Sequence, residues 1–208
     1  MKYPNQLIEL ENELSIYMPD AGLVKSSYDQ LLAINAAEPF PFWAKLWPAS
    51  KALSQFLINN PKWIQDKVVL EMGAGIGQPS LTIAKTCKQL VISDHNKDAV
   101  ELIEKNILHF KLNNAKAMLL DWNSYNNSIP ADTILLSDIN YASEAFEPLL
   151  NTIEYYLAKG TVIIIATPQR IIGAPFIENL QYYIQQSDIA TVLEKDTEVM
   201  ISLYVLYK

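Results

Sequence analysis

The chain has few of the residues that form covalent or metal cross-links. Its 208 residues include one cysteine, Cys87, and two histidines, His95 and His109. A single cysteine excludes an intramolecular disulfide and a zinc site built from cysteines. Neither histidine has a cysteine or carboxylate partner at the spacing of metal ligands, so we expect no metal. The cysteine content favours a reducing compartment, and we expect a cytoplasmic protein.

Long apolar runs are also missing. The longest, Val162 to Ala166 with its neighbours, is far shorter than the roughly 18 residues that a membrane-spanning helix needs. The amino-terminal stretch MKYPNQLIELENEL has no continuous apolar run after its lysine, as a signal peptide would. We therefore expect neither a membrane span nor secretion.

An excess of positive charge is absent too. The formal net charge is −7, and the lysines are scattered along the sequence. Affinity for nucleic acid depends on clustered basic residues, so we expect no nucleic-acid partner and attribute the acidity to solubility. With no low-complexity tract or internal repeat, one ordered domain over residues 1–208 is predicted. The sequence does not indicate an oligomeric state.

After Pro61, short apolar runs alternate with amphipathic stretches, which is typical of a parallel sheet covered by helices on both faces. The predicted strands are residues 67–72, 89–93, 117–120, 132–137 and 161–166. Helical periodicity covers about residues 48–58, 81–87, 100–108, 146–157 and 176–184. Two last strands, 189–193 and 199–207, have so short a connection that they must pair antiparallel. We predict an α/β fold whose sheet ends in an antiparallel hairpin.

Residues 1–45 form an accessory amino-terminal segment in this interpretation. Leu7, Ile8 and Leu10 have a helix-like spacing, whereas Leu14, Ile16 and Met18 alternate like a strand. The aromatic residues at positions 40, 42 and 43 are assigned to hydrophobic packing, with a lid over a site as the alternative.

The clearest motif runs from Val68 to Ser80, VVLEMGAGIGQPS, where a buried strand enters a glycine-rich turn. Gly73, Gly75 and Gly77 let the backbone approach a ligand closely. The third glycine of a dinucleotide motif would fall at position 78, which is glutamine, and this counts against NAD. A sulfonium nucleoside that carries an amino acid instead needs a carboxylate near its ammonium, and Glu71 is the candidate.

Further acids follow the next two predicted strands. Asp94 can accept both hydroxyls of a ribose, with a helix N-cap as the alternative role. Asp121 can accept from an adenine amino group while Trp122 covers the ring, although an exposed acid beside a core tryptophan explains this pair equally well.

The segment Asp138-Ile139-Asn140-Tyr141 comes directly after the strand that ends at Ser137. Ligands of open α/β sheets gather at the carboxyl ends of strands, so we place the chemistry here. Carboxylate and carbonyl oxygens orient an amine, and the Tyr141 ring tolerates positive charge. The alternative is a helix cap at Asp138 with Tyr141 in the core.

These motifs, together with Trp43 and Trp47-Pro48-Ala49, resemble the class I seven-strand methyltransferases, and in particular the group of protein-lysine methyltransferases and nicotinamide N-methyltransferase-like proteins. The resemblance runs from position 40 to the end of the chain. In that group the glycine motif commonly reads E-L-G-A-G-T/C-G-L-P/S, so Met72, Ile76 and Gln78 differ without removing a glycine.

The resemblance implies a Rossmann-like, seven-stranded, mostly parallel sheet and S-adenosyl-L-methionine as the cofactor. It implies that the cofactor is bound by Trp47, Glu71, Gly73, Gly75, Gly77, Asp94, Asp121 and Trp122. It places Asp138 and Tyr141, as a D/E-x-x-Y/F signature, and Asn140 beside the acceptor.

The function expected on these grounds is N-methylation of a protein lysine. Methylation of a small amine is the first alternative, and a non-catalytic module that binds S-adenosylmethionine is the second. A nicotinamide dehydrogenase is disfavoured by the glycine spacing.

Overall fold

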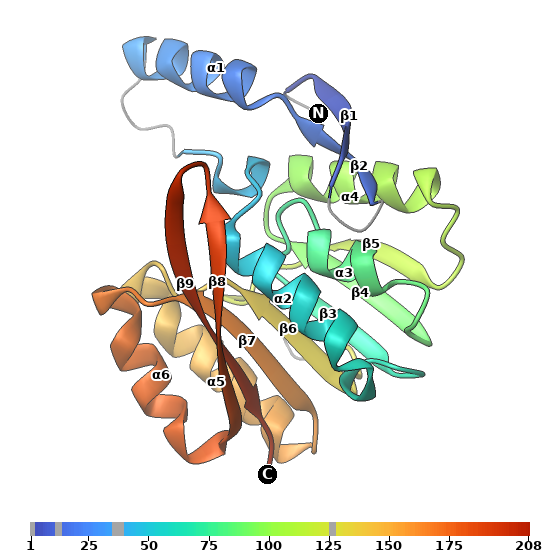
Figure 1. Ribbon diagram of the computed structural model, residues 1–208, viewed down its shortest axis with the longest axis vertical. Helices are drawn as coiled ribbons and strands as arrows, with labels where there is room; N and C mark the ends of the chain where they lie inside the picture. Colours follow the sequence, from blue (N-terminus) through green and yellow to red (C-terminus); the bar gives the residue numbers. More distant parts are fainter. Residues whose placement is uncertain (1–2, 11–13, 35–39, 125–127) are drawn as a thin grey trace.

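Figure 1 shows the computed structural model, which describes residues 3–10, 14–34, 40–124 and 128–208. A seven-stranded sheet is formed by β3 (Val68–Met72), β4 (Gln89–Asp94), β5 (Ala115–Leu119), β6 (Thr133–Ser137), β7 (Val162–Pro168), β8 (Ile184–Glu194) and β9 (Thr197–Leu206). The strand order is β5-β4-β3-β6-β7-β9-β8, with β3 to β7 parallel and the last two strands antiparallel. The predicted α/β fold, with its antiparallel carboxyl-terminal hairpin, is confirmed.

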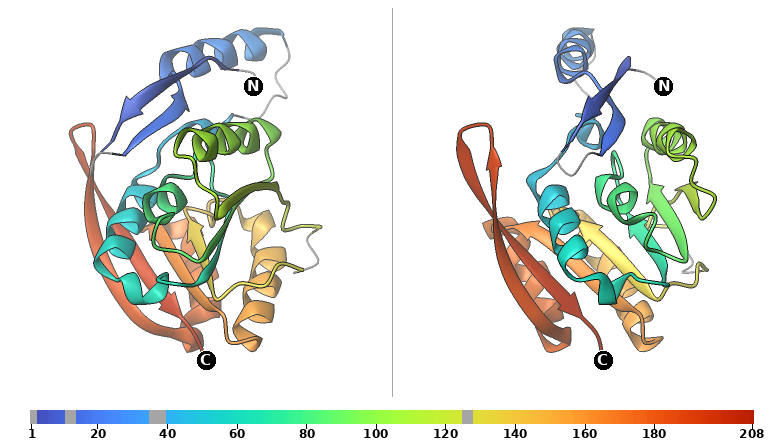
Figure 2. Two further views of the ribbon diagram at one scale, coloured as in Figure 1. Left: turned by 90° about the vertical axis from the view of Figure 1, so that its right-hand side faces the viewer. Right: turned by 45° about the vertical axis from the view of Figure 1, so that its right-hand side comes forward.

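Helices cover both faces of the sheet, as Figure 1 and Figure 2 show. One face packs against α2 (Pro48–Asn59), α3 (Gln78–Ile83) and α4 (Lys97–His109), and the other against α5 (Phe146–Ala158) and α6 (Ala174–Leu180). Successive residues of β7 alternate between the two cores, so Ile164 lies on the α2 side while Ile163 and Ile165 lie on the α5 side. This double burial explains why the strands are continuous apolar runs.

The chain changes direction at the centre of the sheet. β3 pairs with β4 on one side and with β6 on the other, and both pairings are parallel. The connections that leave the carboxyl ends of β3 and β6 therefore diverge. In doubly wound sheets the crevice at such a switch point is where ligands bind.

The accessory segment begins with a separate two-stranded sheet of β1 (Asn5–Glu9) and β2 (Ser15–Pro19), followed by α1 (Ala21–Ile34). The strand predicted around Ile16 is confirmed. The helical interpretation of Leu7 and its neighbours is wrong, because Leu7 pairs with Tyr17 across the hairpin. Residues 1–2, 11–13 and 35–39 of this segment lie outside the described residues, and its assignment to one domain with the rest stays a prediction.

The helix predicted over residues 176–184 is too long. α6 ends at Leu180, and Ile184 opens β8, where it pairs with Leu206. Ile184 has the helical spacing, but its pairing with β9 decides its conformation. The predicted helix over 81–87 also ends early, at Ile83, and the Thr86 carbonyl beyond it accepts a backbone hydrogen bond from Asp66 at 3.1 Å. No helix within the described ranges combines the length and the apolar character that a membrane crossing requires.

Candidate functional site

A cavity of about 460 Å³ lies at the carboxyl ends of β3, β4 and β6. Its size is within the range of small-ligand sites. The glycine turn, the start of the loop after β4, Trp122 and the loop after β6 line it, and an aromatic wall from the segment before α2 closes it. That wall consists of Phe40, Phe42, Trp43 and Trp47.

The three glycines of the turn all have positive φ values of 66°, 55° and 80° at Gly73, Gly75 and Gly77. A Cβ atom added to Gly75 would lie 3.1 Å from the Trp43 carbonyl oxygen, and one added to Gly73 would lie 3.1 Å from the Trp122 ring. A side chain would therefore strain the backbone at all three positions and would crowd its neighbours at Gly73 and Gly75. The backbone of the turn therefore faces the cavity without side chains at its glycines, between Trp43 and Trp122.

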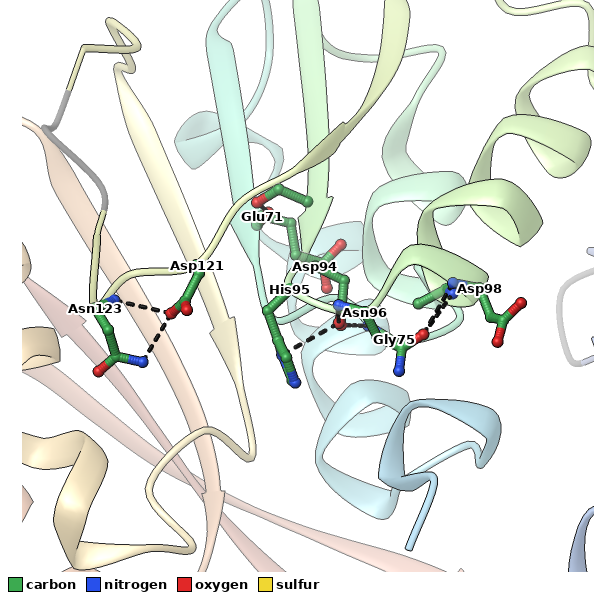
Figure 3. A network of polar contacts seen from close by, with 10 residues as sticks. Glu71, Gly75, Asp94, His95, Asn96, Asp98, Asp121 and Asn123 are labelled. Carbon is green, nitrogen blue, oxygen red and sulfur yellow. Dashed lines mark hydrogen bonds and ion pairs between the residues drawn. The ribbon is translucent and has the colours of Figure 1, made fainter. Parts of the chain in front are cut away.

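Asp94 lies at the end of β4 and is 3% exposed. Its Oδ2 accepts a hydrogen bond from the Gly75 backbone at 2.8 Å, and its Oδ1 accepts one from the Asn96 backbone at 2.8 Å (Figure 3). The residue that caps α4 is Asn96, whose Oδ1 accepts from the Asp98 backbone at 2.9 Å. Asp94 is thus not the cap. Its Oδ1 also lies 3.4 Å from His95 Nδ1, so Oδ2 is the oxygen that keeps a lone pair for a ligand hydroxyl.

Glu71 does not line the cavity. Strand alternation puts its side chain on the face that α3 covers, where its Oε2 accepts a hydrogen bond from the Ser80 backbone at 3.1 Å. Its Oε1 is buried and has no hydrogen-bond partner among the described residues. Burial raises the pKa of Glu71 to about 7, and hydrogen bonding from Ser80 opposes this rise. In this structure Glu71 thus supports the helix start after the turn, and its predicted contact with a ligand ammonium stays a prediction.

Of the predicted pair after β5, only Trp122 lines the cavity. Its ring centroid lies 6.5 Å from that of His95. Asp121 is exposed, and its Oδ1 accepts from both the backbone and the side-chain nitrogen of Asn123, at 2.9 Å and 2.7 Å. Figure 3 shows Asp121 directed toward Asn123, within its own turn. These two hydrogen bonds hold the carboxylate within its own Asx-type turn.

Asp138 and Tyr141 both line the cavity. Asp138 has a φ of 54°, and its backbone N–H donates to Ala166 at 2.8 Å. Ala142 precedes the short helix that follows, so Asp138 does not cap it. The Tyr141 ring centroid lies 5.6 Å from that of Phe42. Burial, together with the negative charges of Asp94 and Asp138, raises the pKa of the Tyr141 hydroxyl.

Asn140, which was predicted to lie beside the acceptor, is not among the residues that line the cavity. It is 2% exposed, its Oδ1 accepts from the Thr167 hydroxyl at 2.6 Å, and its Nδ2 donates to the Gly173 carbonyl at 3.3 Å. Alternation along the loop explains this placement, because Asn140 faces the end of β7 while Tyr141 faces Phe42. Asn140 thus joins the loops that follow β6 and β7.

Two residues at the site were not predicted. Arg170, after β7, forms a two-pronged ion pair with Asp138, in which Nη2 lies 3.0 Å from Oδ2 and Nη1 contacts Oδ1. Ser137 lines the cavity, and its buried hydroxyl has no partner among the described residues. The sequence carried one signal for Arg170, since it is the only arginine of the chain. Over the described ranges, no three His, Cys, Asp or Glu side chains gather as metal ligands would.

Comparison with known proteins adds evidence of relatedness. Residues 28–185 match the lysine methyltransferase family. The chain is similar to calmodulin-lysine N-methyltransferase of Arabidopsis thaliana, with 32% identity over 135 residues that cover 60% of this chain and 44% of the relative. It is also similar to a histone-arginine methyltransferase of Xenopus laevis, with 30% identity over 121 residues that cover 55% of this chain and 51% of the relative. The chain thus spans about half the length of these relatives.

A solved structure shares the fold. The N-methyltransferase NodS of Bradyrhizobium japonicum, in complex with S-adenosylhomocysteine, superposes with a TM-score of 0.63 over 86% of this chain and 98% of that one. The sequence identity is 13%, so the likeness concerns the fold.

Proposed function

Because the chain belongs to the lysine methyltransferase family, we propose that it transfers a methyl group from S-adenosylmethionine to the side-chain nitrogen of a lysine in another protein. The observation that carries the proposal is the joint position of Asp94 and the glycine turn at the switch point of the sheet. There the carboxylate accepts a hydrogen bond from Gly75, and both line one cavity.

The residues of this cavity fit the cofactor. Gly73 and Gly75 leave room that any Cβ atom would fill. Asp94 would hold the ribose hydroxyls, Trp122 and Trp47 offer ring faces, and the unpartnered Ser137 hydroxyl offers a further polar contact. S-adenosylmethionine, when bound, supplies an electrophilic methyl group on its sulfonium.

The acceptor side of the cavity is the loop after β6. Asp138 would accept a hydrogen bond from the acceptor nitrogen and so orient its lone pair. The Tyr141 and Phe42 rings, whose centroids are 5.6 Å apart, would tolerate the positive charge of the methylated product. Holding the amine in line with the methyl group would supply most of the acceleration.

Arginine is the second candidate acceptor, since one similar protein is a histone-arginine methyltransferase. The deciding experiment incubates the protein with methyl-labelled S-adenosylmethionine and a cell lysate, separates protein from small molecules, and maps the labelled residue by mass spectrometry. We expect label on a protein lysine. Label on arginine supports the second candidate, and label confined to the small-molecule fraction contradicts both.

The role of Asp138 is tested by Asp138→Ala. General acid–base or orienting groups contribute about 100-fold or more to turnover, so we expect a loss of at least that size with cofactor affinity near normal. Glu104→Ala, which removes an exposed acid from α4, is the control. Full activity of the Asp138→Ala protein would show that turnover does not depend on Asp138.

The cytoplasmic location is proposed on composition, since the single thiol, Cys87, is buried and suits a reducing compartment. Cell fractionation with an antibody to the protein would test it, and recovery from a secretory fraction would contradict it.

A further inference from the structure

Arg170 is chemically unusual in this chain. Fifteen of the sixteen basic residues are lysines, and the single arginine follows β7, where it meets Asp138. Arginine differs from lysine in presenting a planar fork that matches both oxygens of a carboxylate. Here both terminal nitrogens of Arg170 contact the carboxylate. The single arginine of the chain therefore forms a two-pronged ion pair with Asp138, which lines the cavity.

The two partners lie differently with respect to the cavity. The Asp138 side chain is 6% exposed and lines the cavity, whereas Arg170 is 37% exposed and does not line it. Arg170 thus compensates the charge of Asp138 from outside. Each Asp138 oxygen keeps a second lone pair. The cavity thus receives a hydrogen-bond acceptor whose negative charge the guanidinium partly offsets.

Charge compensation matters for an amine acceptor. An unpaired carboxylate beside an amine stabilises the ammonium form, which has no lone pair and cannot attack the methyl group. A carboxylate paired with a guanidinium still accepts a hydrogen bond but favours the ammonium less. The acceptor can then lose its proton to solvent and remain in the site as the neutral nucleophile.

We propose that Arg170 is a positioning residue that cancels the charge of Asp138, so that the acceptor site favours a neutral amine over its ammonium. This inference rests on the proposed function. Other charged or titratable groups also line the cavity and remain unchanged in the tests below: Tyr3, Lys45, Asp94, His95, Asp98 and Tyr141.

The test uses two ligands that differ in charge at the position of the transferred methyl. Sinefungin has a carbon in place of the sulfur and an amine in place of that methyl, and S-adenosylhomocysteine has nothing there. Calorimetry at neutral pH gives the ratio of their affinities for each variant. For Arg170→Met we expect the ratio to rise in favour of sinefungin by about tenfold or more, the size of one pKa unit of charge interaction. For Arg170→Lys, which keeps the charge, we expect a ratio close to that of the unchanged protein.

A second variant removes the negative partner of the ion pair in place of the positive one, so that no buried carboxylate is left unpaired. Asp138→Asn removes the negative charge and leaves Arg170, so the ratio should fall by about tenfold. Unchanged ratios in Arg170→Met and Asp138→Asn, with S-adenosylhomocysteine still bound, overturn the inference and leave the proposed function standing. Failure of the unchanged protein to bind S-adenosylhomocysteine overturns the proposed function, and the inference with it.

Discussion

At the scale of single residues, the site depends on positions where a side chain is not tolerated. Gly75 combines a φ of 55° with a Trp43 carbonyl oxygen 3.1 Å from the place of a Cβ atom. The neighbour is backbone and cannot rotate away. The glycine turn and the segment around Trp43 therefore limit each other's position.

Gly75→Ala should weaken binding of S-adenosylhomocysteine by about tenfold or more, because either the turn or the Trp43 segment must move. Calorimetry measures this. Gly160→Ala is the matched control, since Gly160 has a φ of 82° and open space around its Cβ position. It should lose about 1 kcal/mol of stability and keep its affinity. Equal affinities in both variants would show that the turn does not contact the ligand.

Glu71 gives the fold a dependence on pH. Its pKa is about 7 in the folded chain, against 4.5 as the ordinary value, so the folded state holds a proton that the unfolded state releases. The stabilisation is complete below pH 4.5 and is lost as the pH rises through 7. The loss is on the order of 3 kcal/mol.

We therefore expect the free energy of unfolding, measured in urea without ligand, to fall between pH 5 and pH 7.5 by about that amount. Glu71→Gln, which cannot ionise, should flatten this fall. The same slope in the variant and in the unchanged protein would assign the effect to other groups.

At the scale of elements, one buried asparagine of α4 connects the accessory amino-terminal segment to the helices that cover the sheet. Asn106 of α4 is fully buried, accepts from the Tyr17 backbone N–H at 2.7 Å and donates to the Tyr17 carbonyl at 3.0 Å. Both backbone groups of one β2 residue thus depend on one side chain. Figure 2 shows the β1–β2 hairpin beside α4, and Tyr3, just before β1, lines the cavity.

Asn106→Ala should release this hairpin, since two backbone groups lose their partner at about 1–3 kcal/mol each. Hydrogen exchange should accelerate over residues 5–9 and 15–19 and remain slow in β3 to β7. Asn179→Ala is the control, because Asn179 is exposed and its side-chain nitrogen donates to the Pro175 carbonyl within α6. Unchanged exchange in β1 and β2 would mean that other contacts hold the segment.

Two loops form the acceptor side as one unit. Asn140 binds Thr167 and Gly173, and Arg170 binds Asp138, so the loops after β6 and β7 are tied by side chains in both directions. A Cβ atom on Gly173 would lie 2.5 Å from the Asn140 amide nitrogen. The position of Asp138 is therefore set by an element that follows it by about thirty residues.

At the scale of the whole molecule, ligand binding should stabilise the entire chain, which we expect to unfold as one unit. S-adenosylhomocysteine at roughly a thousand times its dissociation constant should add about 4 kcal/mol of stability, in a single thermal transition. In Asp94→Ala the gain at the same concentration should shrink. NAD should give no gain. Two separate transitions, or a gain with NAD alone, would contradict the one-domain prediction and the cofactor assignment respectively.

Much of the architecture follows from local sequence pattern. Continuous apolar runs such as Val162–Ala166, short and rich in β-branched residues, favour strands buried on both faces, and the short link between β8 and β9 permits only antiparallel pairing. The turn from Gly73 to Gly77 was also predictable, because only glycine readily adopts its backbone angles. These are properties of short segments.

The orientation of the side chains at the site depends on contacts between segments that are distant in the sequence. Asp94 and Asp121 have the same pattern, an acid at the end of a predicted strand, and each accepts a hydrogen bond from the backbone two residues on. Asp94 also accepts one from the Gly75 backbone, which comes from a distant loop. Asn140 and Tyr141 are neighbours in sequence and face opposite ways, because β7 and Phe42 lie on opposite sides of them. Sequence determines which side chains reach the carboxyl edge of the sheet. Only the packing of separate loops determines which of them face the cavity, because the hydrogen-bond partners that turn each side chain come from elsewhere in the chain.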